Sequence, residues 1–294
     1  MAVTHSVTAI IAVYNGADLI GRAIDSVLAQ TRPVDELIVI DDGSTDSTRE
    51  VVSAYGNRVR YIYQPNGGVA AARNNGTGSA TSEWVAFLDH DDEWLPSKIE
   101  KQLTLVANAP KNVALCYTAH LFHGLDGTRR VIYRPLEKLW PAIRLRNPFP
   151  PSVAMVRKKE VLSLGGFDEK LKGASCEDWD FFVRFLSAYE AVGISDPLVN
   201  YYEAPTSCSR NYRMMLPNTL SIIDKSLLTG LSGVSKALWR RRIKSVLYYR
   251  AAISASESGD PAGEFLLESL VQWPLPDLAP KRFKTVFAQL MRRG

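Results

Sequence analysis

The chain has 294 residues, of which 46% are apolar and 22% are charged, close to the averages of globular proteins. This composition excludes a wholly disordered chain, a collagen-like repeat and a disulfide-dense scaffold. The net charge of +4 is unevenly divided: residues 205–294 carry 14 Lys and Arg against 6 Asp and Glu, whereas residues 1–204 carry 21 against 25. The length predicts one large domain or two modest ones, and the charge division indicates two parts with different partners.

The N-terminal residues and the cysteines indicate where the protein works. The apolar run before Asn15 has no basic region ahead of it, which is typical of a strand and not of a signal peptide. No apolar stretch approaches the ~18 residues that a membrane-spanning helix needs. The three cysteines, Cys116, Cys176 and Cys208, lack metal-like spacing, which favours reduced thiols. We therefore expect a cytoplasmic protein.

The first 110 residues alternate between short apolar runs and amphipathic stretches. Strands are predicted at 6–14, 36–40, 59–64 and 83–88, and helices at 19–28, 47–54, 68–80 and 96–107. A capping box, Ser47-x-x-Glu50, is expected to open the second helix. Strand and helix alternating at this spacing predict βαβ units, and hence an α/β fold with a mostly parallel sheet flanked by helices.

The rest of the chain is less regular and then becomes helical. Strands are predicted at 113–122, 130–134 and 152–157 and a helix at 177–186, followed by amphipathic helices at 218–229, 234–254 and 262–272. Together with the change of charge, this predicts a catalytic domain at 1–205 and a basic helical C-terminal region at 206–294.

Acidic residues follow two of the predicted strands. Asp41 and Asp42 end the second strand, and Asp89, Asp91 and Asp92 end the fourth. Each cluster alone is as well explained by turn and cap formation as by function. Two clusters at equivalent strand ends favour a ligand site, because ligands of open α/β sheets bind outside the carboxyl ends of the strands.

The second cluster has the spacing of a metal site. In an extended segment, Asp89 and Asp91 project to the same side, whereas His90 points to the other. Such a pair of carboxylates can hold Mg²⁺ or Mn²⁺ while leaving positions open for water and phosphate oxygens. This D-x-D pattern is common by chance and gains weight only in context.

Six segments in order resemble the family-two inverting glycosyltransferases of the GT-A fold, a Rossmann-like α/β fold. They are IIAVYNG (10–16), IVIDDGSTDST (38–48), NGGVAAARNNG (66–76), WVAFLDHDDEWLP (84–96), GGFDE (165–169) and CEDWDF (176–181). Each is weak alone, but their order and spacing over residues 5–205 make a specific signal.

The resemblance implies a donor site for a nucleotide-diphosphate sugar, in the first place a UDP-sugar. Ala12 and Tyr14 would line the nucleoside pocket, Asp42 would accept a hydrogen bond from the base, and Arg73 would lie near the nucleotide. Asp89 and Asp91 would meet the ribose and the metal–diphosphate group, with Mn²⁺ or Mg²⁺ as the metal.

The resemblance also implies an acceptor side and a catalytic base. Asp178 matches the base that takes the proton of the acceptor hydroxyl, and Glu177, Gly166 and Phe167 match the acceptor side. The acceptor would be a hydroxyl group of a glycan or of a lipid-linked sugar. A charged residue at a helix start is an equally ordinary place for Glu177 and Asp178, and the two interpretations are compatible.

Two departures from the family pattern limit what the resemblance implies. The Q-x-x-R-W sequence and the membrane helices of processive synthases are absent, which favours non-processive transfer. A histidine common after the last strand is also missing, so Ser207, Ser209, Arg210 or Tyr212 would have to replace it, or the protein does without.

Two other functions are compatible with an acidic α/β chain. A sugar-phosphate nucleotidyltransferase is expected to have a Gly-rich, basic loop after the first strand, and residues 15–18 form none. A sugar-nucleotide-binding protein without catalytic activity is disfavoured because Asp42, Asp91 and Asp178 are all present.

The basic C-terminal region has two open interpretations. Basic side chains interleave with apolar ones at 238–250 and again at 281–293. Basic amphipathic helices suit anionic membrane surfaces, which predicts peripheral contact with the inner face of a membrane. The alternative is a helical subdomain that packs on the catalytic domain with its charges in solvent. Nucleic-acid binding is disfavoured because no stacking aromatics or known module support it.

Overall fold

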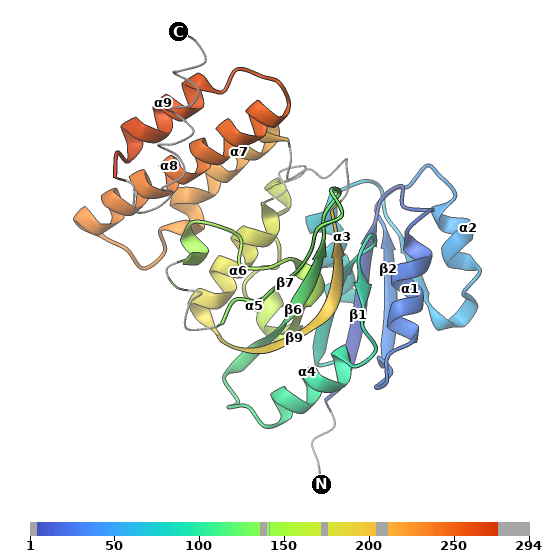
Figure 1. Ribbon diagram of the computed structural model, residues 1–294. Helices are drawn as coiled ribbons and strands as arrows, with labels where there is room; N and C mark the ends of the chain where they lie inside the picture. Colours follow the sequence, from blue (N-terminus) through green and yellow to red (C-terminus); the bar gives the residue numbers. More distant parts are fainter. Residues whose placement is uncertain (1–4, 136–139, 141, 172–175, 204–210, 276–294) are drawn as a thin grey trace. The chain divides into compact units, whose positions relative to one another are not determined.

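The computed structural model describes residues 5–135, 140, 142–171, 176–203 and 211–275 (Figure 1). The chain forms two compact units. Unit 1 comprises Met1–Trp140, Pro148–Gly173 and Glu177–Pro205, and unit 2 comprises Pro141–Asn147, Ala174–Cys176 and Thr206–Gly294. Unit 2 therefore includes more of the sequence than the C-terminal region alone.

Within the described residues, unit 1 is built on one sheet of nine strands in the order β3-β2-β1-β4-β8-β6-β9-β5, with β7 paired to β6. The strands are β1 (Val7–Val13), β2 (Glu36–Asp41), β3 (Arg60–Tyr63), β4 (Trp84–Asp89), β5 (Glu93–Trp94), β6 (Val113–His123), β7 (Arg129–Ile132), β8 (Ala154–Arg157) and β9 (Glu190–Tyr202). The strands β3-β2-β1-β4 are all parallel, β8 is antiparallel to both β4 and β6, and β9 is parallel to β6.

Helices cover both faces of this sheet. They are α1 (Ile20–Leu28), α2 (Thr48–Ser53), α3 (Val69–Ser79), α4 (Lys98–Ala107), α5 (Lys158–Ser163) and α6 (Glu177–Ala188), with short 3₁₀ turns η1 (Gly56–Arg58), η4 (Pro151–Val153) and η5 (Glu169–Leu171). From β1 to β3 each new strand is added on the same side of the sheet, and β4 is then added on the other side of β1. With right-handed crossovers, this order places α1 and α2 on one face of the sheet and α3 on the other (Figure 1).

The helix α3 packs unusually close to the sheet. A Cβ added to Gly76 would lie 2.5 Å from Cγ2 of Ile10, so only glycine fits where α3 crosses β1. Residues Ala70, Ala72 and Thr77 of the same helix are buried. This close packing fixes the position of α3 on the sheet, and α3 carries the site residues Arg73 and Asn74.

The structure confirms the predicted α/β class, and the early elements lie within two or three residues of their predicted bounds. The capping box is wrong: the Ser47 side chain caps nothing, and Asp46 instead accepts hydrogen bonds from the backbone N–H (3.0 Å) and the hydroxyl of Thr48. The sequence also missed α5, β5 and the long strand β9. In β9, residues between Ile194 and Pro197 form a bulge against β6, which breaks the alternating pattern of a strand.

Unit 2 is helical in its described residues, as predicted. It contains α7 (Tyr212–Ile222), the π-helix η7 (Ile223–Leu227), α8 (Gly233–Glu257), α9 (Gly263–Gln272) and the 3₁₀ turn η3 (Ala142–Arg144). The buried Arg144 guanidinium of η3 donates to the carbonyl oxygens of Leu227 and, at 2.8 Å, of Thr229. The segment that precedes β8 is thereby fastened to the end of η7.

The helices α8 and α9 form an antiparallel pair. The hydroxyls of Ser245 and Ser269 donate to each other's backbone carbonyls at 2.7 and 2.8 Å, and both side chains are buried. In the part of the chain that the structure describes, no helix combines the length and the apolar character needed to cross a membrane. The basic group at 281–293 lies outside the described residues.

Candidate active site

The candidate site lies at the carboxyl ends of the parallel strands β1, β2 and β4. In the sheet register, Ala12 of β1 pairs with Ile40 of β2 and Asp89 of β4, and Val13 pairs with Asp41. The two acidic clusters that follow β2 and β4 are therefore brought to one edge of the sheet, where ligands of open α/β sheets bind.

Arg73 of α3 connects the fourth strand with α6. Its Nη2 donates to Oδ1 of Asp89 at 2.6 Å, and its Nη1 donates to Oε1 of Glu177 at 2.9 Å. The Arg73 side chain is only 6% exposed. Burial disfavours its charge, but Asp89, Glu177 and Asp178 outweigh this effect and raise the pKa of Arg73. The guanidinium thus stays charged and joins residues that are distant in sequence.

Asp178 lies in the first turn of α6, next to this ion pair. Burial, reinforced by the neighbouring Glu177 carboxylate and opposed by Arg73, raises the pKa of Asp178 to about 7. One of its oxygens, Oδ1, accepts from the backbone N–H of Trp179 at 2.7 Å. A carboxylate with a pKa near the working pH is suited to accept and release a proton.

The D-x-D residues differ in their surroundings. Asp89 is partly exposed, and Arg22 of α1 donates to the backbone carbonyl of Asp91. Burial and the nearby Asp89 raise the pKa of the Asp91 carboxyl, while His90 and Arg22 oppose the rise. The His90 ring lies beside Gly16, since a Cβ on that glycine would come within 2.5 Å of it.

The donor set fits a hard divalent cation that also binds phosphate. Among the described residues, no three His, Cys, Asp or Glu side chains are gathered into a cluster that could by itself enclose a metal ion. Mg²⁺ is usually held by one or two carboxylates together with substrate phosphates. Asp89 and Asp91 offer that number of carboxylates and no more.

Asp42 is engaged inside the protein. Its Oδ1 accepts from Nε2 of Gln64 (2.7 Å) and from the N–H of Gly67 (2.8 Å), and its Oδ2 accepts from the N–H of Gly68 (2.7 Å). Gly68 has φ of +90°, a conformation that glycine adopts readily. Three of the roughly four acceptor positions of the carboxylate are thus used to shape the turn that precedes α3.

Aromatic side chains are exposed at the same edge of the sheet. Tyr14, which follows β1, is 49% exposed, and Tyr63, which ends β3, is 57% exposed. Ala12 is buried, so its side chain contributes little surface. The sequence singled out Tyr14 but missed Tyr63, because a tyrosine in a strand is unremarkable without its position in the sheet.

The glycine loop before α6 is fastened to α3 and α6. Asn74 accepts from the N–H of Phe167 (2.8 Å) and donates to its carbonyl (2.9 Å), while Arg184 donates to the carbonyl of Gly166 at 2.8 Å. Phe167 is buried and stacks on Phe181 with ring centres 4.2 Å apart. Its ring therefore packs in the core and does not reach a ligand, and Gly166, with φ of +67°, supplies the bend.

Two further residues of the site were missed by the sequence. Tyr201 lies at the end of β9 and is largely buried. Its burial and the nearby negative charges of Asp92, Asp89, Asp91 and Asp178 raise its pKa. Ser152, in the turn η4 that precedes β8, is buried and contacts the D-x-D segment. The missing histidine drew attention to residues beyond 203, of which Ser207, Ser209 and Arg210 lie outside the described residues.

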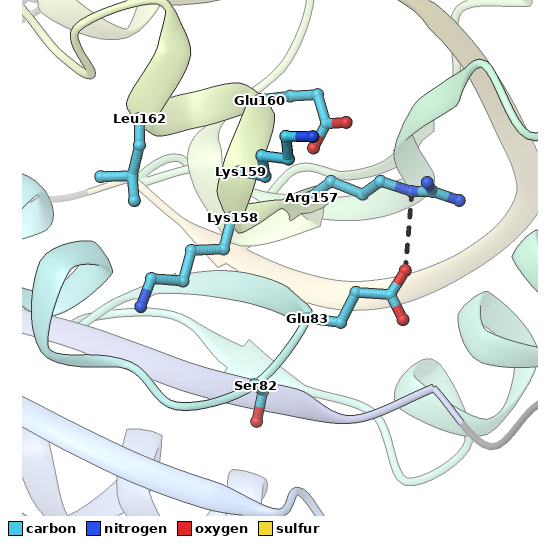
Figure 2. A pocket seen from close by; sticks show the side chains of 7 residues that line it. All are labelled: Ser82, Glu83, Arg157, Lys158, Lys159, Glu160 and Leu162. Carbon is cyan, nitrogen blue, oxygen red and sulfur yellow. Dashed lines mark ion pairs between the residues drawn. The ribbon is translucent and has the colours of Figure 1, made fainter.

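A hollow on unit 1 lies away from this site. It is lined by Ser82, Glu83, Arg157, Lys158, Lys159, Glu160 and Leu162, and Figure 2 shows the ion pair of 3.9 Å between Arg157 and Glu83. Ser82 and Glu83 precede β4, whereas the carboxyl cluster follows it, so the hollow lies at the opposite edge of the sheet. Neither Arg73 nor any of the aspartates described above lines it.

Comparison with known proteins gives a sequence family. The profile described as "Glycosyl transferase family 2" matches residues 8–163, and a second, "Glycosyltransferase like family 2", matches residues 138–220. The putative teichuronic acid biosynthesis glycosyltransferase TuaG of Bacillus subtilis is 38% identical over 129 residues, which cover 42% of this chain and 48% of TuaG. The chain spans about half the length of the curated relatives it matches.

Two solved structures share the fold. TarS of S. aureus (residues 1–349), in complex with UDP, has a TM-score of 0.63 at 20% identity, covering 96% of this chain and 83% of TarS. The mannosyltransferase PcManGT from Pyrobaculum calidifontis, in complex with GDP-Man and Mn²⁺, has a TM-score of 0.59 at 20% identity, covering 98% and 85%. These likenesses confirm the predicted GT-A fold.

Proposed function

The chain belongs to glycosyl transferase family 2, and on this premise we propose that it transfers one sugar, with inversion and metal assistance, from a nucleotide-diphosphate sugar to a hydroxyl group. Membership of this family confirms the family resemblance seen in the sequence. The donor proposed first is a UDP-sugar, and the acceptor a glycan or a lipid-linked sugar. The nucleotidyltransferase alternative is thereby set aside.

One observation supports the proposed chemistry above the others. A base candidate, Asp178, shares an electrostatic cluster with Arg73 and Asp89, at the edge of the sheet where a donor would bind. Transfer with inversion needs a base on the acceptor and positive charge on the leaving diphosphate. The cluster joins a proton acceptor and a D-x-D carboxylate through one buried cation.

The reaction assigns a role to each group. Asp178 takes the proton of the acceptor hydroxyl as its oxygen attacks C1 of the sugar, and the bond from C1 to the diphosphate breaks on the opposite face. Asp89 and Asp91 would hold Mn²⁺ or Mg²⁺, which supplies positive charge to the departing diphosphate. Arg73 holds Asp89 and Glu177 in place, and Glu177 and Gly166 border the acceptor side.

The nucleoside would lie against the exposed aromatic edge. Tyr14 offers a face on which a base can stack, beside the backbone of Ala12. Asp42 shapes the turn before α3 through three hydrogen bonds, and in this proposal its fourth acceptor position would receive a base N–H. Uracil, with one N–H on its pairing edge, suits a single remaining acceptor.

Donor binding is expected to stabilise the protein in a metal-dependent way. Among UDP, GDP, ADP and dTDP, UDP with Mn²⁺ should raise the thermal unfolding midpoint most, because it is the proposed donor nucleotide. A ligand present at 100 times its Kd adds about 2.7 kcal/mol to native-state stability. Asp91→Ala should reduce the UDP affinity measured by calorimetry to its metal-free level.

The matched control for this test is Asp196→Ala, which removes an exposed carboxylate paired with Lys101. It should leave the Mn²⁺-dependent affinity unchanged. A greater stabilisation by GDP would contradict the UDP donor. An unchanged Mn²⁺-dependent affinity in Asp91→Ala would contradict the D-x-D assignment.

Unit 2 is proposed to contact the anionic inner face of a membrane, where a lipid-linked acceptor would be found. Leu267 and Val271 project from α9, and Val234 and Leu238 from α8; all four are exposed. Arg241 of α8 donates to the carbonyls of Val271 (2.9 Å) and Gln272, which brings the two helices together beside these side chains. Apolar and basic side chains on one helix pair suit an anionic lipid surface.

The double variant Leu267→Glu/Val271→Glu is therefore expected to lower the affinity for phosphatidylglycerol-containing vesicles, measured by co-sedimentation, by at least about tenfold. This is the equivalent of ~1.4 kcal/mol. Leu125→Glu/Leu162→Glu adds the same charge at two exposed apolar positions of unit 1 and serves as the control. Equal binding by both double variants would show that Leu267 and Val271 of α9 do not contact the vesicle.

A further inference from the structure

The backbone of the D-x-D segment is held by a buried hydroxyl. The N–H of Asp89 donates to Oγ of Ser152 at 3.1 Å, and the same Oγ donates to Oδ2 of Asp92 at 2.5 Å. A serine hydroxyl has one hydrogen to donate and two lone pairs to accept with, so it can make both bonds at once. Ser152 is fully buried, which removes competition from water.

The third acid of this segment faces inward. Asp92 is 1% exposed, and its second oxygen, Oδ1, accepts from the N–H of Tyr202 at 3.2 Å. Its own N–H donates to the carbonyl of Asp89 at 3.0 Å and closes the turn. Asp92 therefore cannot present its carboxylate to a ligand as Asp89 and Asp91 can.

Ser152 is also held through its backbone carbonyl. The carbonyl of Ser152 accepts from Nε1 of Trp94 at 2.9 Å, and Trp94 is buried in β5. The ends of β4 and β9, the strand β5 and the turn η4 that precedes β8 are thus tied together at Ser152 and Asp92. The D-x-D carboxylates lie on the loop that this tie restrains.

We propose that Ser152 and Asp92 are positioning residues for metal and diphosphate binding by Asp89 and Asp91. The inference rests on the proposed function. Fixing the Asp89 backbone directs its carboxylate towards Arg73, and closing the turn places Asp91 beside Arg22. Groups that orient metal ligands without touching the metal change metal affinity by about 10–100-fold when they are removed.

A merely structural role predicts something different. It would lower the unfolding midpoint of the variants without changing how the folded fraction responds to metal. Ser226→Ala is the matched control, because Ser226 is a buried serine of unit 2 whose hydroxyl donates to the carbonyl of Ile222 at 3.2 Å.

The experiment is a Mn²⁺ titration of UDP binding by calorimetry on the full chain, with the unfolding midpoint measured in parallel. Ser152→Ala and Asp92→Ala are expected to raise the Mn²⁺ concentration for half-maximal binding by about 10–100-fold, and Ser226→Ala to leave it unchanged. Asp92→Asn should recover part of the loss, because its amide oxygen can still accept from Tyr202 and its amide nitrogen can donate to the second lone pair of Ser152 Oγ. The two alanine variants remove the tie from its two sides, so either one that folds is sufficient.

The outcomes separate this inference from the proposed function. Wild-type binding of UDP that does not respond to Mn²⁺ would overturn the metal-assisted function and the positioning role with it. A normal wild-type response together with unshifted titrations in Ser152→Ala and Asp92→Ala would overturn the positioning role alone. Equal shifts in Asp92→Asn and Asp92→Ala would also overturn it, because a role of charge and not of position would then explain the effect.

Discussion

Replacing Asp178 by Asn is expected to lower kcat by about 10²–10⁴-fold and to leave UDP affinity close to that of the wild type. The amide has the shape of the carboxylate but cannot take the proton of the acceptor hydroxyl. The measurement is UDP release from a UDP-sugar in the presence of an acceptor, alongside calorimetry of UDP binding. Glu190→Gln, at an exposed carboxylate at the start of β9, is the control. Undiminished turnover would reject Asp178 as the base.

The same residue predicts a pH profile. Because the pKa of Asp178 is about 7, the fraction of carboxylate rises through neutrality, and kcat should fall about tenfold per pH unit below pH 6 and level off above pH 8. A rate independent of pH between 5 and 8 would contradict the assignment.

The stability of the protein should respond to the same proton in the opposite direction. The pKa of Asp178 is higher in the folded chain than the ~3.9 of an unfolded Asp, so the native state binds more protons between about pH 4 and 7. Its contribution to stability is present below pH 4 and is lost as the pH rises through 7. Asp178→Asn should therefore be at least as stable as the wild type at pH 8, which separates lost turnover from unfolding.

Arg73→Leu is expected to lower the free energy of unfolding by about 3–5 kcal/mol, because removing one partner of a buried ion pair leaves the others uncompensated. The variant would leave Asp89 and Glu177 without their shared cation, beside Asp178. Urea denaturation at pH 7.5 measures the change.

The double variant Arg73→Leu/Glu177→Leu is the informative comparison, since it removes the most buried of the two stranded carboxylates. The double variant should recover part of the loss. Arg73→Lys keeps the charge but cannot contact both carboxylates in the same way, so its free energy of unfolding should lie between those of the wild type and of Arg73→Leu. A loss below about 1 kcal/mol in Arg73→Leu would show that the ion pair stabilises the fold little.

Local patterns were sufficient for the first half of the fold. The strands β1, β2 and β4 are buried apolar runs, and β2 and β4 each end in an aspartate, so their type and the position of the acidic site could both be found from the sequence. The strand β9 could not, because its bulge depends on pairing with β6, a partner distant along the chain. The capping box of α2 is also wrong: the side chain that accepts hydrogen bonds at the start of this helix is Asp46, from the N–H and the hydroxyl of Thr48, and the Ser47 side chain accepts none.

The site shows the same division. Asp89, Asp91 and Asp178 belong to motifs, and their residue types suggest their chemistry. Ser152 has no such motif, and its importance appears only when the chain places its hydroxyl between Asp89 and Asp92. The inward engagement of Asp42 is likewise a property of the turn that it meets, which the sequence does not specify.

The hydrogen bonds from Arg144 to the end of η7 have a practical consequence for the design of truncated proteins. The obvious way to obtain the catalytic part alone is to stop the chain near residue 205. Such a truncation would leave the Arg144 guanidinium without the Leu227 and Thr229 carbonyls it now meets, in a segment that belongs to unit 2. A shortened protein that fails to express or to turn over would therefore say nothing about what the helices do in catalysis. Point substitutions at exposed residues of α9, such as Leu267 and Val271, separate the two questions.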